Sequence, residues 1–155
     1  MPAQVCFVAV DFETDLLRDH LIDAGLDTTR PSFVTWLGVI QYLSRDAVAE
    51  TFTMLGDLAA GTELTVEYVL PTDMRGDAAC DLAERLTVAA AALGEPWLTF
   101  FSPAEMATLL KSCGFSVFEQ VSQREQVDAV VWQRSDGLHP IELSQLARAV
   151  VQAIE

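Results

Sequence analysis

Continuous apolar runs alternate along the chain with amphipathic segments, and this pattern predicts strands that are each followed by a helix. The apolar runs are rich in β-branched residues and have the length of strands buried on both faces; they occupy residues 5–10, 32–40 and 63–70. Apolar positions at helical spacing follow each of them, at residues 15–24, 44–60 and 77–93. The order indicates an α/β fold, with a mostly parallel sheet covered by helices.

Side chains that cap helices mark two of the predicted helix starts. Ser44 is a good N-cap, with Asp46 in the first turn after it. Residues 102–105 read Ser-Pro-Ala-Glu, which is the pattern of a capping box with proline at the first helical position. That second helix is expected to end at Gly114.

The last third of the chain departs from the strand–helix pattern. Residues 115–121 and 127–133 are predicted as strands, and residues 140–154 as a closing helix. The two strands are too close in sequence for a crossover helix, so we expect them to pair as an antiparallel hairpin. No repeat or linker interrupts the chain, which predicts a single domain over residues 1–155.

Composition and charge restrict the partners and the location of the protein. The chain is 51% hydrophobic, which excludes intrinsic disorder, and its mean hydropathy is +0.28. The formal net charge of −14 comes without clustered lysine or arginine, so neither nucleic acid nor an anionic membrane surface is an expected partner. No apolar run approaches the roughly 20 residues of a membrane span, and the N-terminus lacks the features of a signal peptide. We expect a cytoplasmic protein.

Cysteine and histidine are too few and too scattered to predict a metal site or a nucleophilic catalytic set. Cys6, Cys80 and Cys113 form no Cys-x-x-Cys pair and are typical of buried thiols in a reducing compartment. Neither His20 nor His139 has a neighbour at metal-ligand spacing. No catalytic residue is assigned from the sequence.

Four local stretches resemble the leucine carboxyl methyltransferase-like family of S-adenosyl-L-methionine-dependent methyltransferases, in its bacterial branch. They are residues 10–13 (VDFE), 33–44 (FVTWLGVIQYLS), 67–71 (EYVLP) and 93–101 (LGEPWLTFF). The resemblance extends from about residue 5 to about residue 137, and the Trp-Leu-Gly-Val-x-x-Tyr-Leu stretch is its most specific part. It implies a class I methyltransferase-like (Rossmann-like) sheet, S-adenosyl-L-methionine as cofactor, and O-methylation of a carboxyl or hydroxyl group on a small molecule or a protein terminus.

The resemblance covers only the C-terminal half of such an enzyme. Family members begin with a half-domain whose glycine-rich loop lets backbone approach the cofactor and whose acidic residue binds the ribose. The eight glycines of this chain stand apart and form no such loop. We therefore expect a truncated or partial chain that lacks the first two strands, with the outer edge of the strand at residues 32–40 left unpaired.

Candidate cofactor-binding residues follow the first two predicted strands. By resemblance, Asp11 accepts a hydrogen bond from the adenine amino group and Phe12 lines the ring; the alternative is that Asp11 caps the next helix. Trp36, Leu37 and Gly38 lie at the edge where open α/β sheets bind ligands, or belong simply to a core strand. Leu37 stands where better-known members carry an acidic residue that contacts the amino end of the cofactor, and leucine makes no such contact.

Candidate substrate residues are Tyr42, Tyr68 and Trp97. Each tyrosine hydroxyl is placed to orient a substrate carboxyl or hydroxyl, although a half-buried tyrosine packed on a helix is the alternative. Trp97 lies in a loop that is either a substrate lid or a packed connection. Glu67 lies within a strand, where it faces inward beside a partner or outward toward solvent. A carboxylate acceptor needs no general base, whereas a hydroxyl acceptor needs one that the sequence does not identify.

Two functions therefore stay open. The first is a methyltransferase that acts on a small-molecule substrate. The second is a non-catalytic α/β interaction module, which forms a homo-oligomer or completes a partner's sheet through its exposed edge.

Overall fold

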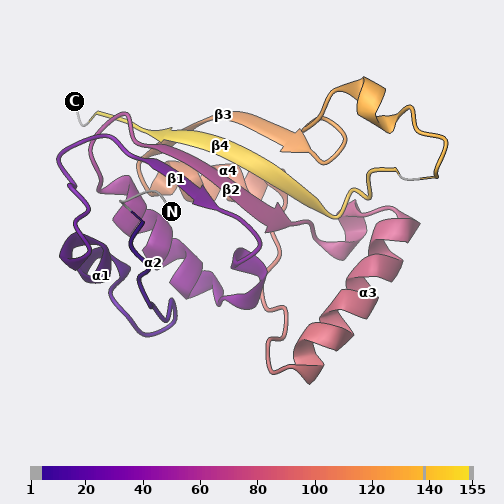
Figure 1. Cartoon of the computed structure of the whole chain (residues 1–155), viewed down its shortest axis with the longest axis horizontal. Helices are drawn as coiled ribbons and strands as arrows, with labels where there is room; N and C mark the ends of the chain where they lie inside the picture. The colour runs from indigo at the N-terminus through magenta and orange to yellow at the C-terminus, as the bar shows by residue number, and fades with distance from the viewer. Residues whose placement is uncertain (1–4, 138, 154–155) are drawn as a thin grey trace.

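A four-stranded mixed sheet organises the computed structural model, which describes residues 5–137 and 139–153 (Figure 1). The strand order is β1-β2-β4-β3, with β1 parallel to β2 and the other two pairs antiparallel. The strands are β1 (Phe33–Trp36), β2 (Glu63–Val69), β3 (Phe115–Ser122) and β4 (Ser144–Val151). The predicted α/β class is confirmed, and β3 pairs antiparallel as expected, but its partner is β4 instead of residues 127–133. Only one of the three strand pairs is parallel, so the sheet is less parallel than predicted.

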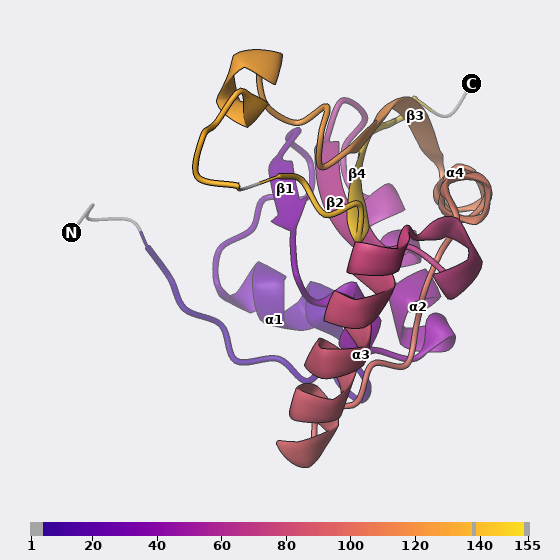
Figure 2. The ribbon, with the colours of Figure 1, turned by 90° about the vertical axis from the view of Figure 1, so that its right-hand side faces the viewer.

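Two of the four helices cover one face of this sheet, and a third extends away from its end. The helices are α1 (Leu17–Asp23), α2 (Arg45–Gly56), α3 (Asp77–Ala92) and α4 (Pro103–Ser112), with short 3-10 turns at Ile40–Tyr42, Thr72–Met74 and Ala129–Trp132. Helices α2 and α4 pack against the sheet and enclose the main core. Helix α3 projects from the end of β2, as Figures 1 and 2 show from two directions. Ala79 and Ala83 attach α3 to the sheet through Val69 and Leu143.

The main core is built on the alternation of side chains along β2. Leu64, Val66 and Tyr68 point into the core and are essentially inaccessible to solvent. Glu63, Thr65 and Glu67 point to the other face and remain half-exposed. Because successive side chains of a strand point to opposite faces, one strand supplies both the core and the outer surface.

Gly56 is required where the ends of α2 and α4 meet. A β-carbon at this position would lie 1.8 Å from the carbonyl oxygen of Cys113, which is backbone and has no room to move away. The missing side chain therefore sets how closely the two helices approach each other.

The predicted strand at residues 5–10 is absent from the structure. This segment has no regular secondary structure, and Figure 2 shows it leading away from the sheet. Phe7 is 87% exposed, and Cys6 is also exposed, contrary to the expected buried thiol. A strand needs a neighbour for its backbone hydrogen bonds, and no described strand lies beside this segment.

Two further predictions in the last third of the chain are wrong. Residues 127–133 form no strand; Asp128 instead caps the 3-10 turn Ala129–Trp132, its carboxylate accepting a 3.0 Å hydrogen bond from the Val130 amide. The predicted helix at residues 140–154, whose last residue lies outside the described part, is replaced by β4. Strand β4 lies between β2 and β3, so pairing on both sides outweighs the helical preference of its alanines.

Candidate functional site

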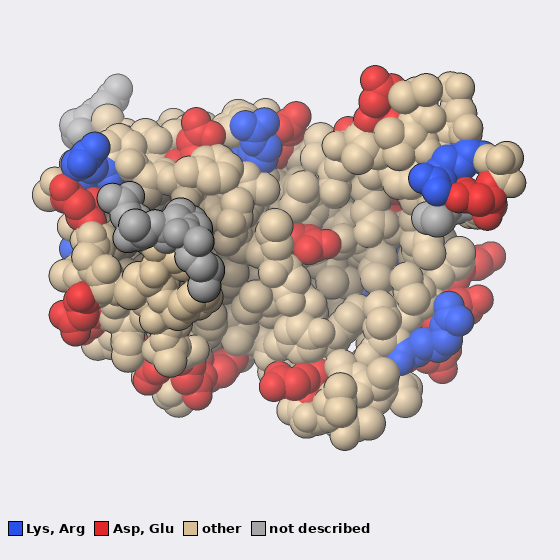
Figure 3. Space-filling view, viewed as in Figure 1, with Lys and Arg blue, Asp and Glu red and all other residues tan. Residues whose placement is uncertain are grey.

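A cavity of about 690 Å³ opens where β1 and β2 end, between the sheet, α3 and the connection from β3 to β4. Its volume lies within the range of small-molecule binding sites. Figure 3 shows the surface hollowed between the body of the molecule and α3. Open α/β sheets bind ligands at this same edge, beyond the carboxyl ends of their parallel strands.

The polar floor of the cavity is a short chain of hydrogen bonds that ends on Glu67. The Ser144 hydroxyl donates to Oε1 of Glu67 over 2.7 Å, and the Gln123 amide donates to the Ser144 hydroxyl over 3.4 Å. Ser144 is buried and belongs to β4, while Gln123 directly follows β3. Three strands of the sheet therefore position one carboxylate.

Apart from Gln41 and Glu95, the remaining walls of the cavity are apolar and aromatic. Helix α3 contributes Leu86 and two alanines, and Leu93 directly follows the helix; both leucines are exposed to solvent. Tyr42 and Trp97 meet edge to face with their ring centroids 6.5 Å apart. The cavity thus places a carboxylate beneath an apolar wall, which is an arrangement for an amphipathic molecule.

Backbone hydrogen bonds fix the loop of Trp97 against the turn that follows β1. Gly38 adopts a φ of +68°, a conformation that favours glycine, and its carbonyl accepts a 3.0 Å hydrogen bond from the Gln41 side chain. The Gln41 carbonyl accepts hydrogen bonds from the backbone amides of Leu98, at 2.6 Å, and Thr99, at 3.3 Å. Gly38, Tyr42 and Trp97, singled out separately in the sequence, therefore line one cavity.

The other predicted cofactor residues lie away from this cavity. The Asp11 carboxylate accepts a 3.0 Å hydrogen bond from the Glu13 amide in a turn that precedes α1. Phe12 stacks on Trp36 at 5.6 Å, and both line an apolar groove beside β1. Trp36 is buried in the core, whereas Leu37 is 50% exposed.

Tyr68 is placed on the core face of β2, opposite the cavity. Its hydroxyl donates toward Oε1 of Gln120 at 2.7 Å and Oε1 of Gln145 at 3.1 Å. Burial raises the pKa of this phenol well above its usual value. The hydroxyl is thus engaged inside the protein.

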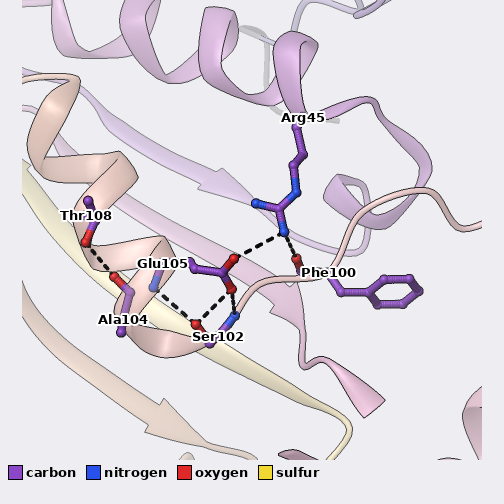
Figure 4. Close-up of polar contacts among 6 residues, drawn as sticks. All are labelled: Arg45, Phe100, Ser102, Ala104, Glu105 and Thr108. Atoms are coloured by element: carbon purple, nitrogen blue, oxygen red, sulfur yellow. Dashed lines mark hydrogen bonds and ion pairs between the residues drawn. The ribbon is translucent and has the colours of Figure 1, made fainter. Parts of the chain in front are cut away.

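A second polar cluster joins α2 to the start of α4 (Figure 4). The predicted capping box is confirmed: Ser102 donates to Oε2 of Glu105 from both its amide and its hydroxyl, each over 2.8 Å, and its hydroxyl accepts from the Glu105 amide. These hydrogen bonds from Ser102, with smaller help from Arg45, lower the pKa of Glu105. Arg45 donates to the Phe100 carbonyl over 2.7 Å and lies 4.5 Å above the Phe101 ring. Because these groups satisfy one another, the cluster serves to hold α2 against α4.

Sequence reasoning did not assign Ser144 and Gln123 to the site, and it left the direction of Glu67 open. Glu67 was detectable, because Thr65 and Glu63 precede it at the spacing of one strand face. Ser144 was hidden by the predicted helix over residues 140–154, and Gln123 lies beyond the end of a predicted strand. Ser144 and Gln123 come close to Glu67 only because β4 pairs with both β2 and β3.

Membrane-spanning helices and metal-binding clusters are both absent from the described residues. No helix in residues 5–137 and 139–153 is long and apolar enough to cross a membrane. Within the same part of the chain, no group of three or more His, Cys, Asp or Glu residues is arranged to hold a metal ion.

Sequence comparison connects the chain to methyltransferases. The profile of the family described as leucine carboxyl methyltransferase matches residues 1–56. A Bacillus subtilis protein named "Putative S-adenosyl-L-methionine-dependent methyltransferase YktD" is 28% identical over 151 residues, which are 97% of this chain. The match covers 49% of that protein, so the chain spans about half the length of its curated relative.

Solved structures show the same fold at low sequence identity. A protein of the duf574 family from Streptomyces avermitilis matches with a TM-score of 0.63 and 19% identity, over 88% of this chain and 52% of the other. A structure from Thermobifida fusca, titled as that of a "putative methyltransferase", matches with a TM-score of 0.59 and 18% identity, over 88% and 51% of the two chains.

Proposed function

We propose, from the similarity of this chain to the leucine carboxyl methyltransferase family, that it forms the acceptor side of an S-adenosyl-L-methionine-dependent methyltransferase. The observation that carries the proposal is the cavity beyond the carboxyl ends of the parallel strands β1 and β2. Its lining joins Gly38 and Tyr42, from the stretch that most resembles the family, to Trp97 and Glu67.

The turn after β1 is suited to contact the cofactor through its backbone. Apart from its two neighbours in the chain, no described residue has a heavy atom within 4 Å of the position that a Gly38 β-carbon would occupy, so a ligand has access to the backbone there. The exposed side chain of Leu37 adds an apolar contact. Asp11, Phe12 and Trp36 act in this proposal as supports, because they hold the N-terminal turn against β1.

The bound cofactor would supply a methyl group on a positively charged sulfur, and the chain would hold the acceptor in line with it. Positioning two reactants in the correct geometry supplies a large part of such a rate enhancement. Tyr42 and Trp97 would orient a small molecule whose carboxyl or hydroxyl oxygen receives the methyl group.

The free edge of β1 is the proposed contact for the rest of the methyltransferase. Strand β1 has only β2 as a described neighbour, and Phe33 on it is 64% exposed. The apolar groove beside it, about 340 Å³ in volume, is lined by Phe12, Leu21 and Val34 among others. A sheet edge next to an apolar groove favours the addition of further strands. We propose that these come from the half of the fold that the curated relative has in addition, on the same polypeptide or a separate one.

Sedimentation of the 155-residue chain tests this contact. A monomer that forms a complex only when the other half of the methyltransferase is added agrees with the proposal. A stable homodimer that the other half does not dissociate would instead support the homo-oligomer expected from the sequence.

Calorimetric titration with S-adenosylhomocysteine tests the proposed function. We expect weak, saturable binding by the chain, and tighter binding once the other half of the fold is present. Gly38→Ala should weaken this binding several-fold, because a side chain then occupies the open backbone. Gly25→Ala is the matched control, since Gly25 also has a positive φ and open surroundings but lies outside the cavity. Absence of binding by a folded, completed protein would refute the proposal.

A further inference from the structure

We infer that the cavity takes a molecule whose polar end donates a hydrogen bond, a hydroxyl or an amine on an apolar body, and that Glu67 receives this end. The inference rests on the proposed function and narrows it, because it excludes a carboxylate as the acceptor. Four observations support it: the free oxygen of Glu67, the engaged donors around it, the charge of the lining and the apolar wall.

Glu67 has one occupied and one available carboxylate oxygen. The Ser144 hydroxyl holds Oε1 at 2.7 Å, and no donor among the described residues reaches Oε2. Two side-chain amides nearby each direct one hydrogen bond elsewhere, because Gln123 donates to the Ser144 hydroxyl and Gln41 donates to the Gly38 carbonyl. The floor of the cavity therefore presents a vacant acceptor.

The charge of the lining disfavours an anionic ligand. Glu67 and Glu95 both line the cavity. Among the described residues that line it, there is no lysine or arginine. A carboxylate in the cavity would meet like charge without a compensating cation, whereas a hydroxyl or amine gains a charge-assisted hydrogen bond.

The upper part of the cavity is suited to an apolar body. Leu86 of α3 and Leu93, which directly follows this helix, are exposed to solvent and line the cavity. Trp97 also lines the cavity, and its indole nitrogen is buried without a partner among the described residues. An aromatic ring in the ligand would contact both this indole and the leucines.

With a hydroxyl acceptor, the transfer balances through Glu67. A lone pair of the acceptor oxygen attacks the methyl carbon of a sulfonium donor, forming the C–O bond. The C–S bond breaks, and its electron pair stays on the sulfur, which becomes a neutral thioether. The proton of the acceptor hydroxyl passes to Oε2 of Glu67.

Three small probes of similar shape test the inference by binding alone. Benzyl alcohol, benzylamine and benzoate are titrated into the 155-residue chain, and tryptophan fluorescence reports occupancy. We expect the alcohol and the amine to bind at least about tenfold tighter than benzoate, since only they donate to the carboxylate. Trp97→Phe should abolish the fluorescence response if the probes bind in this cavity. Preferred binding of benzoate would overturn the inference.

Two matched variants assign the preference to Glu67. Glu67→Gln removes the charge and adds an amide donor, so the preference over benzoate should fall by about tenfold. Glu63→Gln makes the same change on the same strand and face, outside the cavity, and should leave the probe order unchanged. Circular dichroism confirms the fold of each variant. An unchanged order in folded Glu67→Gln would refute the role of Glu67.

The outcomes separate this inference from the proposed function. Probe binding in the expected order without S-adenosylhomocysteine binding would refute methyl transfer and leave the specificity of the cavity intact. S-adenosylhomocysteine binding with benzoate as the preferred probe would support methyl transfer and refute the hydrogen-bond-donor acceptor.

Discussion

The two faces of β2 differ in what their side chains contact, although they alternate residue by residue. Tyr68 lies in the core with its hydroxyl on Gln120 and Gln145, while its neighbour Glu67 faces the cavity with one oxygen held by Ser144. On the core face every position is closed to solvent; on the other face Thr65 and Glu63 remain half-exposed. One strand therefore supplies the buried core on one face and part of the cavity lining on the other, so substitutions on the two faces should differ in their effect on stability.

The largest effect is expected on the core face. Leu64 is only 1% exposed, and Leu64→Ala should lower the free energy of unfolding by about 2–5 kcal/mol through lost burial and the cavity left behind. Urea denaturation measures the loss. A change below about 0.5 kcal/mol, the usual size at exposed positions, would mean that the two faces do not differ as described.

Alkaline pH should act on the same face through Tyr68. Burial raises the pKa of Tyr68 in the folded state. The contribution of this residue to the free energy of unfolding is therefore fully present below its unfolded-state pKa near 10, and it is lost as the pH rises toward the folded-state pKa. Between these two pKa values, the free energy of unfolding of the wild type should fall with pH more steeply than that of Tyr68→Phe. The difference in slope should reach about 1.4 kcal/mol per pH unit. Parallel curves for the two proteins, from denaturation at pH 9 to 12, would contradict this assignment.

The smallest effect on stability is expected on the cavity face. Glu67→Gln keeps an oxygen for the Ser144 hydroxyl and should change the free energy of unfolding by less than about 1 kcal/mol. Glu63→Gln, at a weak 4.0 Å ion pair with Arg148, should change it by no more than about 0.5 kcal/mol. Thermal melts of both variants measure these shifts, and a loss as large as that of Leu64→Ala would remove the distinction between the faces.

Local chemistry made the helices and the first two strands of the sheet predictable. Ser44 and Ser102 cap helices where the sequence places them, because an N-cap depends on residues within one turn. Strand β2 was recognisable from its apolar residues, and the turn after β1 from Gly38. Gly38, Tyr42 and Trp97 are predictable as candidate site residues from their places near strand ends and from the family resemblance, whereas their common cavity is not.

Non-local pairing explains what could not be predicted. Ala147 and Ala149 favour a helix by themselves, yet they are fully buried in β4 between two neighbouring strands. Residues 5–10 show the opposite case. Their apolar sequence is suited to a strand, but the segment forms no strand, because no described strand lies beside it to pair with. The partners of Glu67 likewise depend on strands far apart in the sequence.

The exposed segment at residues 5–10 gives the net charge of −14 a further consequence for colloidal behaviour. Apolar side chains such as Phe7 favour association between copies, and the shared negative charge opposes it over about 10 Å at 0.1 M salt. Added salt screens this repulsion, and acidification toward the isoelectric point near 4.3 removes it. The same protein should therefore stay dispersed in dilute neutral buffer and aggregate in concentrated salt or mild acid.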